Sequence, residues 1–135
     1  MPGSQPEVQR SVIEATIART RAATDGNDWD AFVDCFAENG RFMNSALPAP
    51  AEGREAIRSV AKKWPRVVNI EEWRTIEGAR FAIGWNERPY GLGPEHVYRG
   101  MSSFLFDATG QILDYEGIFD PAKVAAVFAR LKQNS

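Results

Sequence analysis

The sequence predicts an α+β fold in which helices come first, mostly antiparallel strands follow, and one helix ends the chain. Three features lead to this prediction. In the first half of the chain, apolar residues recur at spacings of three and four, as on one face of a helix. From Val67 onward, apolar and polar residues alternate, as in strands with one buried face. After Asp120 the helical spacing returns.

Three helices are expected in the first half, each indicated by an apolar stripe and by residues that begin or end helices. Ser4 and Glu7 have the spacing of a capping box. Pro65 ends the third helix, because the residue before a proline is disfavoured in the helical conformation. The expected limits are about Ser4–Thr24 for the first helix, Trp29–Phe36 with a stop at Asn39-Gly40 for the second, and Gly53–Trp64 for the third.

A long hairpin is expected to form the centre of the sheet. Its strands, residues 97–106 and 111–120, flank the turn Asp107–Gly110, in which glycine suits a positive φ. This turn predicts a register in which Ser102 lies opposite Tyr115. The other expected elements are strands at Arg41–Asn44, Val67–Glu77 and Arg80–Asn86, a loop at Glu87–Glu95, and a last helix capped by Asp120 before Pro121.

One face of this hairpin mixes small residues with aromatic rings. It carries Gly100 and Ser102 on the first strand, and Tyr115 and Gly117 on the second. Small residues between rings favour the floor of a cavity, and the alternative is a bulged, fully packed sheet. We expect the sheet to curl around the first three helices, to bury their apolar stripes and to leave space between.

Composition limits the organisation and the partners. The chain has 135 residues and no repeat or linker, so residues 1–135 are expected to form a single domain. A net charge of -2 predicts no binding to nucleic acid or to anionic membranes. No apolar run has the length of a membrane span or the place of a leader peptide. The single cysteine, Cys35, excludes an internal disulfide, and together these features predict a cytoplasmic protein.

Four segments resemble a known family. They are the Asp28-Trp29 cap, the stretch 35–39 (CFAEN), the helix start 53–57 (GREAI) and the turn 106–112 (FDATGQI). They are similar to segments of ketosteroid isomerases and SnoaL-like polyketide cyclases, in the nuclear transport factor 2-like superfamily. The resemblance implies a conical α+β barrel with an apolar pocket, commonly a homodimer through the outer face of the sheet.

The catalytic groups of the isomerases do not carry over to this chain. The resemblance places their proton-shuttling Asp at Asn44, their oxyanion-hole Tyr at Thr20 and their protonated Asp at Ser102. A neutral amide does not take a proton from carbon at neutral pH, so steroid-type isomerisation is not expected. The Asp-Arg-Asp arrangement of limonene-epoxide-hydrolase relatives is also incomplete, because one of its Asp positions is Gly117.

The positions expected to face the cavity are neutral, and they are aromatic or carry hydroxyl and amide groups. Such a lining suits a small apolar or aromatic molecule with a few oxygens. His96 is the only histidine; with Tyr98 it would serve as base and oxyanion donor, and the alternative is a solvent-facing loop residue. The expected catalytic residues are His96, Tyr98 and Asn44, and the expected substrate-binding residues are Thr20, Thr24, Trp64, Trp85, Gly100, Ser102, Tyr115, Gly117 and Phe119.

Asp114 and Glu116 are expected on the outer face of the sheet, because they alternate with Tyr115 and Gly117. A bulge near Gly117 would turn one of these carboxylates inward. One histidine without a carboxylate on the same helix predicts no metal site, and no dinucleotide or phosphate-binding motif is present. No cofactor is therefore expected.

Two functional hypotheses follow. The first is a cofactor-free cyclase, dehydratase or isomerase acting on a small hydrophobic carbonyl or polyketide-like substrate. In it, His96 or an unassigned carboxylate moves the proton, while hydroxyl and amide groups orient the substrate and stabilise an enolate. The second is a non-catalytic small-molecule-binding or dimerisation module of the same fold. The polar lining favours the enzyme, which we place first, and the missing isomerase carboxylates favour the module.

Overall fold

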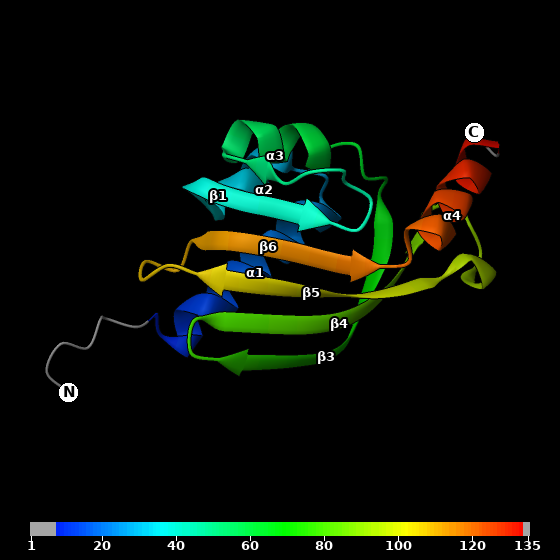
Figure 1. The fold of residues 1–135 in the computed structure, drawn as a ribbon. Helices are drawn as coiled ribbons and strands as arrows, with labels where there is room; N and C mark the ends of the chain where they lie inside the picture. Colours follow the sequence, from blue (N-terminus) through cyan, green and yellow to red (C-terminus); the bar gives the residue numbers. More distant parts are fainter. Residues whose placement is uncertain (1–7, 134–135) are drawn as a thin grey trace, which may run out of the picture.

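A computed structural model, which describes residues 8–133, confirms the α+β architecture (Figure 1). One curved sheet carries all six strands, and along the chain the helices lie before, between and after these strands. The helices are α1 (Arg10–Asp25), α2 (Trp29–Asp34), α3 (Arg54–Ala61), the short 3-10 segment η1 (Pro94–His96) and α4 (Pro121–Gln133). The strands are β1 (Phe36–Asn44), β2 (Ala51–Glu52), β3 (Val67–Glu77), β4 (Arg80–Pro89), β5 (Tyr98–Phe106) and β6 (Ile112–Phe119).

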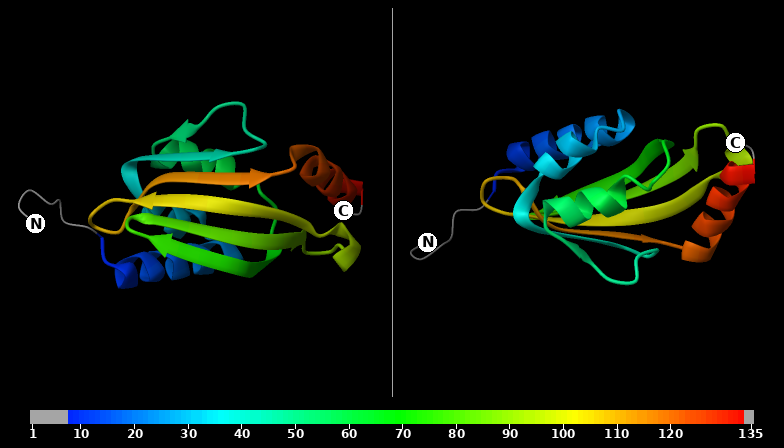
Figure 2. Two further views of the ribbon diagram at one scale, coloured as in Figure 1. Left: turned by 60° about the horizontal axis from the view of Figure 1, so that its bottom comes forward. Right: turned by 90° about the horizontal axis from the view of Figure 1, so that it is seen from above.

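The strand order in the sheet is β2-β1-β6-β5-β4-β3. Strands β1 and β6 run parallel, and the other neighbouring pairs are antiparallel. Because β2 and β3 lie at opposite edges, the sheet is curved but does not close into the expected barrel. Figure 2 shows α1, α2 and α3 on one side of the sheet, with α4 across its end. The helices therefore cover the concave face.

Helix α1 packs the predicted apolar stripe against the sheet, with Ile13 and Thr16 fully buried. Its N-cap is Gln9, without a side-chain capping bond. The predicted capping box of Ser4 and Glu7 lies outside the described residues. The end of α1 at Asp25 is one residue beyond the predicted Thr24.

The predicted extent of the second helix was wrong. Helix α2 ends at Asp34, and Phe36 already begins β1, where it lies beside Ile112 of β6. Phe36 and Ile112 are fully buried. Because parallel pairing with β6 buries Phe36, the strand is favoured over continuation of the helix. Asn39-Gly40 therefore lies inside a strand with an irregular register and does not terminate a helix.

Three further limits differ from the prediction. Helix α3 ends at Ala61, so Trp64 lies in the turn after it. The segment before α3 contains the two-residue strand β2, which was not predicted and which pairs with β1. Strand β4 extends to Pro89, three residues beyond the predicted Asn86. Glu87 therefore lies in a strand, between Asn69 of β3 and Tyr98 of β5.

The predicted register of the long hairpin was also wrong. Ser102 lies opposite Gly117, and Phe104 lies opposite Tyr115. The register shifts near the turn, where Phe106 pairs with Ile112 while the preceding residue pairs with Asp114, so Leu113 is the extra residue of a bulge. The bulge lies before the residues of β6 that face the cavity, so Asp114 does not line the cavity. The Asp114 carboxylate accepts a 3.1 Å hydrogen bond from Arg41.

Candidate ligand-binding and active site

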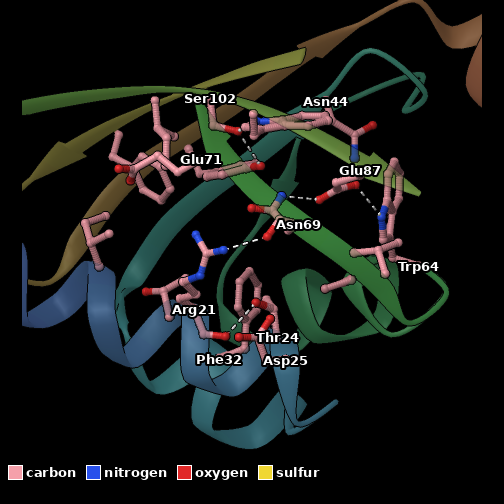
Figure 3. A pocket seen from close by; sticks show the side chains of 18 of the residues that line it. Arg21, Thr24, Asp25, Phe32, Asn44, Trp64, Asn69, Glu71, Glu87 and Ser102 are labelled. Carbon is pink, nitrogen blue, oxygen red and sulfur yellow. Dashed lines mark hydrogen bonds between the residues drawn. The ribbon is translucent and has the colours of Figure 1, made fainter. Parts of the chain in front are cut away.

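A cavity of about 350 Å³ lies between the concave face of the sheet and helices α1 to α3 (Figure 3). The hollow predicted from the hairpin is therefore present. Its volume falls within the range of small-molecule pockets. Much of its wall is aromatic, with Trp29, Phe32, Phe42, Trp64, Phe81, Trp85, Phe104, Tyr115 and Phe119 among the lining residues.

The floor of the cavity is built in rows that run across neighbouring strands. Each row contains residues that pair directly in the sheet, so their side chains leave the same face. In order along β4, the rows are Phe81–Phe104–Tyr115–Phe42, Ile83–Ser102–Gly117–Asn44, Trp85–Gly100–Phe119 and Asn69–Glu87–Tyr98. The second and fourth rows bring polar groups to the floor, and the third row separates them with apolar surface.

The two glycines of the predicted site, Gly100 and Gly117, do not line the cavity but leave space for rings that do. A Cβ atom on Gly100 would lie 2.4 Å from the Trp85 ring and 2.7 Å from the carbonyl oxygen of Ile118. A Cβ atom on Gly117 would lie 3.1 Å from the Tyr115 hydroxyl. Both residues therefore allow an aromatic side chain to lie close over the strand.

In the cavity wall, where Glu14, Asp25 and Glu71 also lie, Glu87 brings a carboxylate that the predicted site lacked. Its Oε1 accepts hydrogen bonds from the Tyr98 hydroxyl at 2.9 Å and from Trp64 Nε1 at 3.4 Å, and its Oε2 accepts one from Asn69 Nδ2 at 2.7 Å. Three neutral donors therefore hold Glu87 in the cavity wall, and Figure 3 shows two of them, Asn69 and Trp64. The alternation of inward residues along β4 would have found it, because Glu87 follows Trp85 by two positions.

Burial raises the pKa of Glu87 above its ordinary value, and the three hydrogen bonds partly oppose this shift by favouring the ionised form. Burial and the neighbouring Glu87 carboxylate also raise the pKa of the Tyr98 phenol, so Tyr98 stays protonated as a donor. An acid with a raised pKa in an aromatic cavity is suited to proton transfer near neutral pH.

A second polar cluster lies around Ser102, which is buried and lines the cavity. Trp85 Nε1 donates to Ser102 Oγ at 2.9 Å, and Ser102 Oγ lies 2.9 Å from the Tyr115 hydroxyl. Burial raises the pKa of Tyr115 to about 12, so this hydroxyl is also neutral. In the same row, Asn44 Oδ1 accepts a hydrogen bond from the backbone N–H of Ala46 at 2.9 Å.

Helix α1 supplies the remaining predicted site residues and part of the wall. Thr20 and Thr24 line the cavity, but both hydroxyls donate to carbonyl oxygens of their own helix, at 2.8 and 3.0 Å. Arg21 Nη2 donates to the carbonyl oxygen of Asn69 at 2.6 Å and so joins α1 to β3 beside the cavity (Figure 3). The threonine hydroxyls are thus oriented by the helix backbone.

Neither residue of the predicted pair, His96 and Tyr98, is among the residues that line the cavity. His96 lies in η1 and is not among the cavity-lining residues; its Nε2 is 3.4 Å from Oε1 of Glu95. Tyr98 is buried behind the cavity wall and contacts Glu87. The predicted residues that line the cavity are Thr20, Thr24, Asn44, Trp64, Trp85, Ser102, Tyr115 and Phe119. The geometry therefore offers Glu87, and not His96, for acid–base chemistry at the cavity.

Two further features of the described part of the chain bear on partners. Across residues 8–133, no three His, Cys, Asp or Glu side chains gather in a way that would hold a metal ion. No helix within the same residues is both long enough and apolar enough to cross a membrane.

Comparison with known proteins gives one family and many similar folds. A SnoaL-like domain model matches residues 17–115, whereas no curated protein matches the sequence. Three solved structures illustrate the likeness. An NTF2-like protein of unknown function from Cytophaga hutchinsonii is 15% identical, with 91% of this chain and 98% of that chain covered and a TM-score of 0.69.

The other two structures have names that refer to cyclisation. A proposed polyketide cyclase from Sinorhizobium meliloti is 22% identical, with 76% of this chain and 93% of that chain covered and a TM-score of 0.63. SalBIII, an epoxide hydrolase/cyclase-like enzyme of pyran ring formation in salinomycin, is 17% identical, with coverages of 85% and 95% and a TM-score of 0.70. The curved sheet, its covering helices and the family match over residues 17–115 together show that the chain belongs to the SnoaL-like domain family.

Proposed function

We propose that the protein binds a small hydrophobic carbonyl or polyketide-like compound in the cavity and catalyses its cyclisation, dehydration or isomerisation without a cofactor. The observation that carries this proposal is Glu87, an acid with a raised pKa in a cavity lined largely by aromatic rings. A side chain of this kind, placed close to the substrate, can accelerate proton transfer to and from carbon or a hydroxyl group.

In this proposal the ionised carboxylate of Glu87 takes a proton from the substrate and later returns it at another atom. Tyr98 and Asn69 keep the carboxylate oriented, because each donates one hydrogen bond to a different oxygen. Trp64 donates the third bond and lines the cavity, so it also contacts the bound molecule. Hydroxyl and amide groups of the floor stabilise negative charge on a substrate oxygen.

The family supports this class of reaction. The SnoaL-like match and the two similar structures whose names refer to cyclase chemistry favour a ligand that closes a ring. At 22% identity or less, those structures establish the fold, and the reaction of this chain rests on Glu87.

The test is turnover of a panel of cyclisable aromatic polyketones by wild type and Glu87→Gln. Loss of the general base is expected to reduce kcat by about 10²- to 10⁴-fold. Glu95→Gln, in the exposed part of η1, is the matched control and is expected to keep wild-type kcat. Equal turnover by wild type and Glu87→Gln would remove the catalytic role of Glu87.

A non-catalytic binding module is the second candidate. It is favoured by the neutral residues Thr20, Asn44 and Ser102 at the positions where the resemblance places the isomerase groups. In that case the panel compounds bind to wild type and Glu87→Gln, and neither protein converts them.

We also propose that the protein forms a homodimer through the outer face of the sheet, in the cytoplasm. A row on that face pairs Trp73 with Gly84, Met101 and Ile118, and its three large side chains are 38% to 49% exposed. Such an apolar row is suited to contact with a second copy. The single cysteine is compatible with a reducing compartment. Native mass spectrometry tests the dimer directly.

A further inference from the structure

We propose that Arg21 is a positioning residue for the Glu87 carboxylate and that it acts through Asn69. Arg21 holds the backbone of Asn69, and the side chain of Asn69 in turn holds Glu87. This inference rests on the proposed function, because it names a residue that does not touch the carboxylate but prepares it for that reaction.

The connection consists of two short hydrogen bonds that share Asn69. Arg21 Nη2 of α1 donates to the backbone carbonyl oxygen of Asn69 at 2.6 Å, and Asn69 Nδ2 donates to Glu87 Oε2 at 2.7 Å (Figure 3). The first bond has a charged donor, which makes it stronger than a bond between neutral groups. Among residues 8–133, Asn69 is the only donor to Glu87 Oε2, since Trp64 and Tyr98 donate to Oε1.

Asn69 depends on this support because it lies on an edge strand. Strand β3 pairs with β4 along one side, and no other described strand lies along its other side. The register with β4 shifts at Glu72, so Asn69 belongs to a short regular segment at the start of β3. Within residues 8–133, the bond from Arg21 is the only hydrogen bond between α1 and β3. Its loss would leave this segment held from one side alone.

Arg21 is the residue of α1 that can make this bond. The charged residues of α1 in the cavity wall are Glu14, Arg21 and Asp25. Ionised carboxylates only accept hydrogen bonds, so Glu14 and Asp25 cannot hold a carbonyl oxygen. The hydroxyls of Thr20 and Thr24 already donate to carbonyl oxygens of α1 itself. No other polar side chain of α1 in the wall can therefore replace Arg21.

The other charged groups of the cavity wall stand apart from this connection. Arg74 and Glu71 of β3 pair with each other, with Arg74 Nη2 at 2.6 Å from Glu71 Oε1. Tyr98 and Tyr115 remain protonated, because burial raises the pKa of both phenols. Within residues 8–133, no hydrogen bond or ion pair joins Glu87 to the charged residues Glu14, Asp25, Glu71 and Arg74.

Asn69 is the donor with the largest effect on the acid. Burial raises the pKa of Glu87, and among its three hydrogen bonds the one from Asn69 lowers this pKa most. A looser Asn69 therefore leaves the effect of burial less opposed. Removal of Arg21 is expected to raise the pKa of Glu87 further, although Arg21 does not contact the carboxylate.

The experiment follows the titration of Glu87 directly, without a substrate. The side-chain carboxyl ¹³C resonance of Glu87, assigned by its absence in Glu87→Gln, is recorded against pH. The proteins compared are wild type, Arg21→Met, Arg21→Lys, Asn69→Ala and the double variant Arg21→Met/Asn69→Ala. Methionine keeps a long side chain but has no N–H to donate, whereas lysine keeps a charged donor.

Arg21→Met is expected to raise the pKa of Glu87, and Asn69→Ala is expected to raise it at least as far because it removes the bond itself. The double variant is expected to match Asn69→Ala, since Arg21 acts only through Asn69. Arg21→Lys is expected to lie between wild type and Arg21→Met. An unchanged titration in Arg21→Met would overturn the proposal. So would a shift from Arg21→Met that persists in the Asn69→Ala background, because the arginine would then act through its charge alone.

Arg10→Met is the matched control. It makes the same change on α1 at a residue that does not line the cavity, and it is expected to leave the titration of Glu87 as in wild type. A shift as large as that of Arg21→Met would show a general effect of charge on α1 and would overturn the proposal.

A second measurement uses wild type alone and covers the case in which a variant does not fold. The two Nη ¹⁵N signals of Arg21 are expected to be separate, because a hydrogen bond at Nη2 slows rotation of the guanidinium group. A single averaged signal would overturn the proposal.

Failure of the proposed function gives a different result. If Glu87 is not the catalytic base, its titration still shifts in Arg21→Met, but the acidic limb of the kcat/KM profile does not follow. If Arg21 is not a positioning residue, the titration stays unmoved in Arg21→Met, while Glu87→Gln still loses turnover.

Discussion

Tyr98 and Glu87 face each other across β4 and β5, and the Tyr98 hydroxyl donates to Glu87 Oε1 at 2.9 Å. The pair stands where the two strands meet α4, because Phe128 of that helix packs against Tyr98 and Trp64. Phe128 therefore contacts both residues that donate hydrogen bonds to Glu87 Oε1, Trp64 and Tyr98. The C-terminal helix therefore has a role in orienting the proposed catalytic acid.

Tyr98→Phe is expected to shift the pH dependence of the reaction. The hydrogen bond from Tyr98 lowers the pKa of Glu87, so its loss raises that pKa further. If Glu87 acts as a base, the acidic limb of the kcat/KM profile moves to higher pH. Tyr90→Phe, which removes a phenol that is 51% exposed, is the control and is expected to leave the limb unmoved. An unchanged limb in Tyr98→Phe would contradict the proposed pairing.

The stability of Glu87→Gln relative to wild type is expected to depend on pH. The pKa of Glu87 is raised above its ordinary 4.5 in the folded state, so the folded protein holds this proton more tightly than the unfolded chain. The stabilisation from this group is complete below pH 4.5 and is lost as the pH rises through the raised pKa. Glu87→Gln has no ionisable group at this position, so its stability does not fall in this way as the pH rises.

The melting temperature of both proteins is measured at several pH values between about 4 and 8. The difference, variant minus wild type, is expected to increase with pH. A constant difference across the range would show that burial does not raise the pKa of Glu87.

Gly100→Ala is expected to destabilise the protein and to narrow the cavity. The new methyl group would lie 2.7 Å from the Ile118 carbonyl oxygen, which is backbone and cannot turn away, and 2.4 Å from the Trp85 ring. Overpacking of this kind typically costs about 1 to 3 kcal/mol of the free energy of unfolding. Urea denaturation measures the cost, and weaker binding of 2-acetylnaphthalene measures the loss of space. Wild-type values for both would mean that Trp85 does not lie over Gly100 in solution.

Local patterns in the sequence were sufficient for most of the fold. The helical stripe of α1, the strand β3 with its turn at Gly78, and the cap of α4 at Asp120 are all confirmed. Each depends on residues within a few positions of one another. Strand β1 was partly missed, because its start at Phe36 is decided by pairing with Ile112, far along the chain.

The candidate site was predictable only in part, for the same reason. The alternation of small and aromatic residues in the hairpin indicated a hollow, and eight of the predicted residues line it. The place of Glu87 in the cavity wall was not predicted, because the end of β4 was assigned to a loop. The bulge at Leu113 also shifts the register between β5 and β6. Ser102 therefore pairs with Gly117, and Tyr115 pairs with Phe104.

The sequence by itself determined the α+β class, the aromatic and hydroxyl character of the lining and the absence of the isomerase carboxylates, because these depend on residue type and local spacing. Only the tertiary structure decided that Glu87 is held in the cavity wall and which donors reach its carboxylate. Those properties depend on cross-strand register and on enclosure. Enclosure raises the pKa of Glu87, and register places Asn69 and Tyr98 on either side of it.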